Sequence, residues 1–213
     1  MVKASAVLLS LCLLGFAPAL AQEAEPVQLP PPQTEIGVLL MQALKLRQSS
    51  RSFDTRPLPV QELSNLVWAA DGINRPESGK RTAPSARNFQ EVDIYVALPE
   101  GLYLYEANTH SLTPIVAEDL RAMTGVQAFV ADAPLNLVYV ADLARMGNAS
   151  EDDKRLYSGT DVGVIVQNVY LYCASQGLAV VVRASVDRAP LAEAMKLRPE
   201  QRIILSQTVG YPK

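Results

Sequence analysis

The amino-acid sequence predicts an α+β fold in which helices flank a mostly antiparallel sheet. Two runs that alternate β-branched or aromatic residues, VDIYVAL and GLYLYEA, are separated only by Pro99-Glu100 and therefore indicate a β-hairpin. Apolar residues recur at helical spacing in several other segments, most extensively over residues 157–177. Further short apolar runs in the second half of the chain are typical of strands.

The N-terminal residues carry the pattern of a Sec signal peptide. Lys3 precedes an apolar run that is too short to span a bilayer, and Ala19-Leu20-Ala21 is a small-x-small cleavage site. We therefore expect residues 1–21 to be removed on export and the protein to be periplasmic or secreted.

The chain after the cleavage site divides into a tether and one domain. Residues 22–33 are polar and proline-rich and are expected to be an extended, flexible tether, whereas residues 34–213 have the length of one domain. Of the 19 basic and 22 acidic residues, Lys3 leaves with the signal peptide, so the net charge becomes 18 − 22 = −4. This balance argues against nucleic acid as a partner, and no later segment is apolar for long enough to span a membrane. Cys173 alone remains of two cysteines, which excludes an intramolecular disulfide.

Helical periodicity predicts the first two helices of the domain. The first follows Thr34, a candidate cap, ends near Arg47, and has its apolar positions at Ile36, Leu39, Leu40, Ala43 and Leu44. The second begins at Pro59, stops before Gly72, and has its apolar positions at Leu63, Leu66, Val67 and Ala70. Residues 72–90 then form a long irregular segment, and loops of this length are commonly functional or disordered.

The elements after the hairpin follow from the same patterns. A short helix is predicted over residues 117–123, a buried strand over 134–142 and the long helix over 157–177. The last elements are a strand over 178–185, a helix from its cap Asp187 through Leu197, and a closing strand over 202–210.

Several common enzyme classes lack their signatures. His110 is the only histidine, and with one mature cysteine the residues for a zinc site or a Cys-His nucleophile pair are missing, so no metal ligands are predicted. The sequence contains no G-x-S-x-G, G-x-G-x-x-G or Walker motif. We expect His110, in a turn-like segment, to be a surface or merely polar-paired residue.

The segment LRQSSRSF, residues 46–53, concentrates groups that bind phosphate. Arg47 and Arg51 bracket Ser49, and two guanidinium groups with a hydroxyl suit one phosphate and an attached polyol chain. The alternative is a plain helix terminus, in which the arginines complement the helix dipole and the serines cap or turn the chain. Taken alone, the segment favours this second interpretation.

Four stretches together resemble the nitroreductase family. LRQSSRSFDTRPLP is similar to its opening R-x-S-x-R-x-F motif, and APSARNFQ (83–90) to its P-S-x-x-N-x-Q motif. A long helix that ends in Gly-Leu before a strand, DVGVIVQNVYLYCASQGLAVVV, and the closing ILSQTVGYPK follow in family order. ALPEGLYLYEANTHSL and WAADGINR further resemble the branch of SagB-type dehydrogenases. The resemblance spans roughly residues 34–213 and implies a nitroreductase-like fold and an FMN-dependent oxidoreductase.

The resemblance implies which residues hold the phosphate end of FMN. Arg47, Gln48 and Ser49 match the positions that contact the phosphate and ribityl oxygens, and Arg51 matches the basic position that joins them. Lys213 lies near C-terminal basic positions that contact the phosphate in relatives. Relatives often carry a basic residue or histidine where Gln48 stands, which implies a lower affinity for phosphate.

The resemblance also implies which residues approach the flavin ring. Asn88 matches an amide that faces the pyrimidine edge, and Val182, Arg183, Ala184 and Ser185 match a segment whose backbone approaches N5. Relatives commonly carry glycine near Ala184 and Ser185, so the approach is expected to differ there. Arg183 is either a cation that stabilises an anionic reduced flavin or a surface arginine at a strand end.

The family further implies a homodimer with FMN at the subunit interface, exchanged terminal segments and ping-pong hydride transfer at flavin N5. No protein acid or base is predicted, because the flavin carries the chemistry. Asn74 and Arg75 are either polar contacts to a small-molecule or peptide substrate or turn formers, and turn formation is favoured. NAD(P)H is not expected outside the cytoplasm, so the electron donor stays open. The alternatives are a flavin-binding electron carrier and a degenerate, non-catalytic interaction module.

Overall fold

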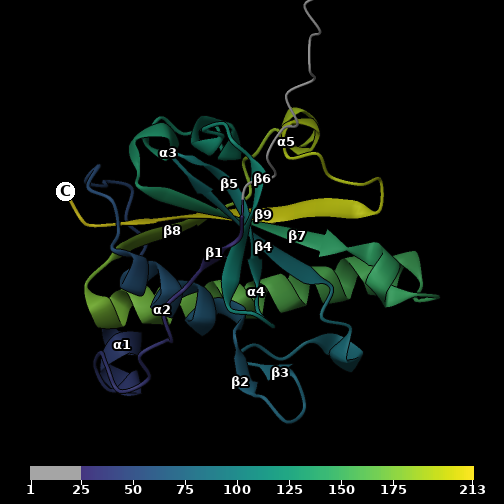
Figure 1. The fold of residues 1–213 in the computed structure, drawn as a ribbon, viewed down its shortest axis with the longest axis horizontal. Coiled ribbons are helices and arrows are strands. Elements are labelled where there is room, and N and C mark those ends of the chain that lie inside the picture. The colour runs from purple at the N-terminus through teal and green to yellow at the C-terminus, as the bar shows by residue number, and fades with distance from the viewer. Residues whose placement is uncertain (1–24) are drawn as a thin grey trace, which may run out of the picture.

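The computed structural model describes residues 25–213, so the predicted signal peptide lies outside the described residues. The centre is a seven-stranded sheet in the order β1-β6-β5-β4-β7-β9-β8, in which neighbouring strands are antiparallel (Figure 1). Its strands are β1 (Val27–Gln28), β4 (Val92–Leu98), β5 (Gly101–Glu106), β6 (Ser111–Val116), β7 (Leu135–Asp142), β8 (Ala179–Arg183) and β9 (Gln201–Gly210). The helices are α1 (Leu40–Leu46), α2 (Val60–Asp71), α3 (Phe129–Asp132), α4 (Glu151–Gln176) and α5 (Arg188–Ala194). The predicted α+β class is confirmed.

Strand β7 forms the middle of the core because both of its faces are apolar. All eight of its residues are buried. Leu137 and Tyr139 belong to the cluster that contains α2 and α4, whereas Val138 and Val140 belong to the cluster that contains α5. This separation follows from the two-residue period of a strand, and it places helices on both faces of the sheet (Figure 1).

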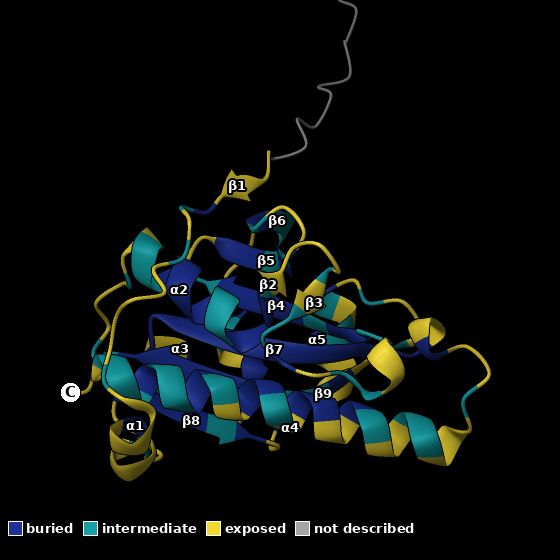
Figure 2. Ribbon diagram, turned by 90° about the horizontal axis from the view of Figure 1, so that it is seen from below, coloured by how far each residue is buried: buried dark blue, intermediate teal, exposed yellow. Residues whose placement is uncertain are grey.

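The long helix α4 begins six residues earlier than the periodicity predicted. The Ser150 hydroxyl accepts a hydrogen bond from the backbone N–H of Asp153 at 3.1 Å, and Gly177 ends the helix with φ +70°. The helix packs along the sheet and keeps one exposed stripe (Figure 2). No helix within residues 25–213 is both long and apolar enough to cross a membrane.

The first predicted helix is shorter than expected and does not bury its apolar face. It begins at Leu40 because Gly37 has a left-handed φ of +85° and Leu39 is extended. Ala43 is its one buried residue, whereas Leu39 and Met41 are 83% and 76% exposed. Exposed apolar groups of this size commonly mark an interaction surface.

The segment expected to be a flexible tether is held against the domain in its described part. Strand β1 pairs with β6, Leu29 is 3% exposed, and the Ser64 hydroxyl donates to the carbonyl of Pro30 at 2.6 Å. Proline-rich composition alone predicted mobility, but a buried leucine and strand pairing fix residues 27–30.

Further elements also differ from the periodicity-based expectations. Strand β6 was not predicted, because Pro114 and its turn-forming neighbours disguised it. The long loop contains a small hairpin of β2 (Ile73–Arg75) and β3 (Lys80–Arg81), which projects from the body of the domain (Figure 1). The helix predicted over 117–123 is only a 3₁₀ turn over Arg121–Thr124, since the Asp119 carboxylate accepts the Arg121 N–H at 3.0 Å and forms a competing turn.

Candidate functional site

The arginine–serine segment, residues 47–51, runs beside the edge strand β8. The backbone N–H of Ser50 donates to the carbonyl of Val180 at 2.9 Å. The Ser49 hydroxyl lies 2.8 Å from the hydroxyl of Tyr170 on α4. The structure therefore brings together two segments that the sequence assigned to one cofactor, although more than 120 residues separate them.

Tyr170 fixes this junction, and the sequence analysis missed it. Its hydroxyl accepts the backbone N–H of Val182 at 3.0 Å as well as meeting Ser49, and the Arg47 guanidinium lies 5.4 Å from its ring centroid. A signal was present, because Tyr170 follows Val166 by one helical turn on the apolar face. A buried tyrosine hydroxyl on such a face needs a polar partner.

The C-terminus completes the same edge of the molecule. Phe53 forms an antiparallel bridge with Pro212, so the register places Lys213 opposite Ser52. Arg47, Arg51 and Lys213 form no ion pair within the described residues. Three cations without a carboxylate partner thus lie along one segment.

Gln48 was also assigned to the phosphate and ribityl chain by the sequence. It lines a cavity of about 210 Å³ between this segment and β8. Ser50, Val180 and Pro212 line it as well. Arg47, Ser49 and Arg51 neighbour Gln48 and Ser50 in the chain but do not line the cavity. The segment as a whole offers an amide, hydroxyls and unpaired cations, which are donors that suit phosphate and polyol oxygens. The residues present therefore fit the phosphate and ribityl chain of FMN.

Arg183 is buried, so the alternative that it is a surface arginine at a strand end is wrong. The residue is 5% exposed, and its Nη1 and Nη2 donate to the Thr124 carbonyl at 2.6 Å and to Asn136 Oδ1 at 3.0 Å. Burial without a neighbouring carboxylate lowers the pKa of Arg183 to about 10. The guanidinium therefore anchors the loop around Thr124, while Ala184 and Ser185 follow the strand at the exposed surface.

Asn88 lies away from the arginine–serine segment within one chain. It belongs to the 3₁₀ turn Ala86–Asn88, is exposed, and its Oδ1 accepts from Gln90 Nε2 at 3.2 Å. The Ala86 N–H donates to Asp161, nine residues before Tyr170 on α4, which is about 13 Å along the helix axis. A single chain therefore does not unite the two motifs.

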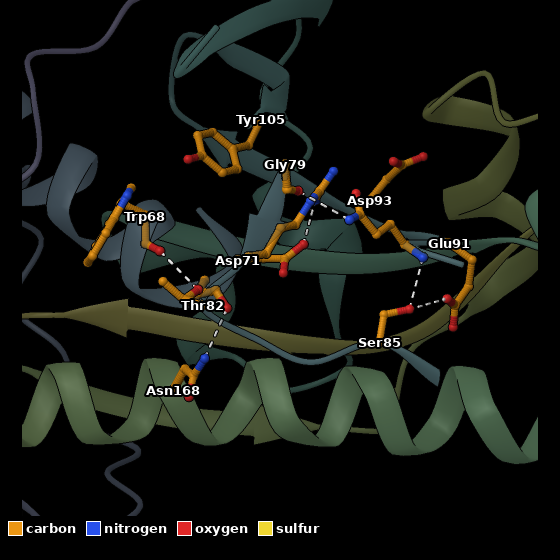
Figure 3. A network of polar contacts seen from close by, with 12 residues as sticks. Trp68, Asp71, Gly79, Thr82, Ser85, Glu91, Asp93, Tyr105 and Asn168 are labelled. Carbon is orange, nitrogen blue, oxygen red and sulfur yellow. Dashed lines mark hydrogen bonds and ion pairs between the residues drawn. The ribbon is translucent and has the colours of Figure 1, made fainter. Parts of the chain in front are cut away.

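Asn88 instead lines a second cavity of about 220 Å³, here called the carboxyl cavity. Its buried acids are Asp71, Glu91 and Asp161, none more than 5% exposed. Arg81 Nη1 donates to Asp71 at 2.5 Å, and the Ser85 hydroxyl donates to Glu91 at 3.3 Å (Figure 3). Of the two polar residues proposed in the loop, Arg75 lines this cavity. Asn74 Oδ1 accepts a hydrogen bond from Arg75 Nε at 3.0 Å.

Sequence reasoning missed these acids, although their positions carried a signal. Asp71 follows Val67 by one turn on the buried face of α2, and Asp161 precedes Ile165 by one turn on that of α4. A carboxyl group at an apolar helix position needs a partner or a proton.

Burial raises the pKa of two acids of this cavity. The pKa of Asp71 is about 7, since loss of hydration outweighs the opposing effect of the Arg81 guanidinium. Burial also raises the pKa of Glu91, and the neighbouring Asp161 carboxyl adds to the effect.

We expect Asp71→Asn to change how stability depends on pH. The pKa of Asp71 is 3.8 in an unfolded chain and about 7 when folded, so between these values the folded protein holds a proton that the unfolded chain has lost. The free energy of unfolding of the wild type therefore falls as pH rises through this range, by up to about 4 kcal/mol relative to Asp71→Asn. Denaturant titrations of the wild type and of Asp71→Asn at pH 4.5 to 8 measure this difference in the free energy of unfolding. Asp152→Asn, at an exposed carboxylate, is the control, and parallel curves for wild type and Asp71→Asn would contradict the assignment.

His110 is polar-paired, as expected, and has a structural place. Its Nε2 lies 2.8 Å from the Ser64 hydroxyl and 3.1 Å from the Pro30 carbonyl, and its Nδ1 lies 3.0 Å from the Tyr105 hydroxyl. Burial lowers its pKa. The described residues contain no group of three or more His, Cys, Asp or Glu placed to hold a metal ion.

Comparison with known proteins identifies the family. The sequence model of the nitroreductase family matches residues 44–211. The chain belongs to the nitroreductase family. A crystal structure of a candidate nitroreductase from Ralstonia eutropha JMP134 is 45% identical, with a TM-score of 0.86 over 93% of this chain and 96% of the other. A candidate nitroreductase of Methanocaldococcus jannaschii is 32% identical over 171 residues, 76% of this chain and 86% of its own.

More distant nitroreductase-like structures share the fold alone. The E. coli microcin synthetase McbBCD complex, solved with truncated pro-MccB17 bound, is 16% identical with a TM-score of 0.72, over 95% of this chain and 85% of that one. The NADPH:FMN oxidoreductase of Vibrio harveyi is 20% identical with a TM-score of 0.61, over 82% and 69%. The predicted nitroreductase-like fold and oxidoreductase class are confirmed, and the SagB-type branch stays a prediction.

Proposed function

We propose that this nitroreductase is an exported, FMN-dependent enzyme that passes two electrons between a donor and a small-molecule or peptide substrate. The observation that carries the proposal is the arrangement of the arginine–serine segment. Arg47 and Arg51 lack carboxylate partners within the described residues, and Ser49 is fixed against β8 through Tyr170. A phosphate would supply the anionic partner that these two arginines lack.

The residues of this edge have separate tasks in the proposal. Arg47, Arg51 and Lys213 bind the phosphate, and Gln48 and Ser49 bind the ribityl chain. Val182 to Ser185 would line the flavin ring. When bound, FMN would supply the redox chemistry, a two-electron transfer at N5 between a donor and a second substrate in a ping-pong cycle. The protein binds and orients the reactants.

A homodimer is part of the proposal, because one chain leaves the site and an apolar surface incomplete. Asn88 lies near Asp161 on α4, whereas Arg47 and Ser49 lie near Tyr170, so a second copy is needed to bring an Asn88 side chain to the ring. The apolar residues of the α1 region remain exposed: Ile36, Leu39, Leu40, Met41, Leu44 and Leu46. A second copy of the same chain can cover such a surface, so no other protein is needed for this.

The substrate class follows from two distant relatives and from the predicted export. The V. harveyi relative is named an NADPH:FMN oxidoreductase, and NADPH is not expected outside the cytoplasm, whereas the microcin synthetase was solved with truncated pro-MccB17 bound. We therefore favour oxidation or reduction of an extracytoplasmic small molecule or peptide, in the manner of SagB-type dehydrogenases. Sequencing of the N-terminus of the protein recovered from the periplasm tests the export, with cleavage after Ala21 as the expected result.

Absorbance spectroscopy separates the proposal from its two alternatives. The mature chain mixed with FMN is expected to shift the flavin bands, and dithionite is expected to bleach them. A colourless protein that ignores FMN supports a non-catalytic interaction module. Flavin binding without turnover, tested with artificial donors and with quinone or nitroaromatic acceptors, supports an electron carrier.

Arg47→Ala is expected to weaken FMN binding by about 1.5–3 kcal/mol, the range for hydrogen bonds to a charged group. Fluorescence titration of FMN measures the dissociation constant. Arg155→Ala is the matched control, because this arginine pairs only with the exposed Asp152 among the described residues. Equal FMN affinity of Arg47→Ala and wild type would contradict the assignment of Arg47 to the phosphate of FMN.

A further inference from the structure

The carboxyl cavity separates its charges by depth. Six ionisable residues line it, three acids and three bases, so the lining is balanced overall. The acids are buried, with Glu91 at 0% and Asp161 at 5% exposure. Arg75 and Lys80, on the projecting hairpin β2-β3, are exposed. The floor of the cavity therefore carries the carboxyl groups and its rim carries the exposed cations.

Two acids of the floor have no cationic partner within the described residues. Arg81 pairs with the third acid, and neither Glu91 nor Asp161 forms an ion pair. Glu91 accepts from Ser85 through Oε2, but its Oε1 is fully buried with no hydrogen-bond partner (Figure 3). A buried polar atom left without a partner costs about 1–3 kcal/mol, so the floor suits a ligand that brings hydrogen-bond donors.

The cations at the rim of the cavity, in turn, lack anionic partners. Arg75 donates to Asn74 Oδ1 and to the Arg81 carbonyl, and both acceptors are uncharged. Lys80 forms no ion pair in the part of the chain that the structure describes. Both cations are thus available for an anionic group at the mouth of the cavity.

We propose that the carboxyl cavity binds a small zwitterion of the amino-acid class. Its ammonium group lies against Glu91 and Asp161, and its carboxylate lies at Arg75 and Lys80. A balanced lining favours a ligand with no net charge, and the separation of the two signs favours one whose charges lie at opposite ends. A volume of about 220 Å³ suits a molecule of this size. Asn88, which the proposed dimer brings to the flavin ring, also lines this cavity, so the inference rests on the proposed function and names a ligand class for the same site. FMN binding, measured separately by absorbance, distinguishes a failure of the proposed function from a failure of this inference.

Isothermal titration calorimetry on the mature protein, with the cofactor it retains on purification, tests the proposal. The probes are 4-aminobutyrate, butylamine and butyrate, which share a carbon chain and differ in their charges, and the zwitterion series from glycine to 6-aminohexanoate. We expect the best zwitterion to bind at least about ten-fold more tightly than the amine or the acid of its length, because both ends are recognised. Equal affinities, preference for a single-charged probe, or no binding by any zwitterion would overturn the proposal.

Two variants assign the two ends of the ligand. Glu91→Gln is expected to weaken zwitterion and butylamine binding, whereas Lys80→Gln is expected to weaken zwitterion and butyrate binding, each by about ten-fold. Lys196→Gln, at an exposed lysine away from the cavity, is the control. Lys80 is exposed, so its variant folds and decides the matter even if Glu91→Gln does not. Unchanged zwitterion affinity in Lys80→Gln would contradict the proposed orientation.

Discussion

Gly125→Ala is expected to destabilise the folded protein by about 3–5 kcal/mol, the range for disrupting a buried charged group. A Cβ at position 125 would lie 1.8 Å from Arg183 Nη1 and 3.0 Å from Arg183 Cζ. The backbone itself imposes no penalty, since a φ of 178° is extended and open to any residue. The effect therefore comes from the contact alone.

Arg183 has no inexpensive way to move aside. Its guanidinium is buried and donates to the Thr124 carbonyl and to Asn136. Displacing it removes both hydrogen bonds while the charge stays buried, which is the costly outcome. The shortest of these bonds, 2.6 Å to the residue beside Gly125, leaves little room for adjustment.

Denaturant unfolding of Gly125→Ala, Arg183→Ala and the double variant measures the contact. In the double variant the new methyl group no longer meets a guanidinium, so its destabilisation should be well below the sum of the two single effects. Additive effects would show that the clash with Arg183 is not the cause.

Gly163→Lys is expected to convert the proposed dimer into a folded monomer and to abolish tight FMN binding. Gly163 lies on the exposed stripe of α4, and a Cβ there meets nothing within 4 Å in the single chain. Leu156, Gly159, Thr160 and Gln167 share this exposure. From Leu156 to the end of the helix the only charged residue is Asp161, which is buried, so the exposed stripe carries no charge at all.

An uncharged exposed stripe over about three turns is unusual for a helix that faces water. Two glycines one turn apart allow a second helix to approach closely, and a lysine there would be desolvated in the dimer. We expect the dissociation constant of the dimer to rise by at least about a hundredfold. The monomer should remain stable, because lysine is a better helix former than glycine by about 0.5–1 kcal/mol.

Analytical ultracentrifugation and FMN titration measure the two effects of Gly163→Lys. Ala189→Lys is the matched control, since it places the same charge at an exposed helical position on α5. A Gly163→Lys protein that stays dimeric would place the interface elsewhere. A monomer that still binds FMN as tightly as wild type would show that one chain holds the whole cofactor site.

Most elements of the domain could be predicted from local pattern. The hairpin of β4 and β5, the buried strand β7 and the helix α2 have strong periodicity, and each was placed within a few residues. Strand β6 was missed because Pro114 is atypical of strands, and it is tolerated here between β1 and β5 near the edge of the sheet. Helix α1 showed an apolar period that predicted burial, yet the single chain leaves that face open.

The candidate site divides in the same way. The R-x-S-x-R-x-F resemblance named Arg47, Ser49 and Arg51, and the fold sets this segment beside β8 and the C-terminal Lys213. Tyr170, whose hydroxyl joins the two segments, was not singled out from the sequence: its place on the apolar face of α4 indicated a buried hydroxyl in need of a partner, but the partners Ser49 and Val182 lie far away in the chain.

The sequence by itself determined the family, the order of the main helices and strands, and the residue types available for phosphate, because these depend on local spacing and motif. Only the tertiary structure decided that Arg183 is buried, that Asn88 lies apart from Arg47, and that Asp71, Glu91 and Asp161 share a cavity. The physical reason is that burial and charge pairing depend on residues far apart in the chain, and the pKa of Asp71 and the orientation of Arg183 follow from those neighbours.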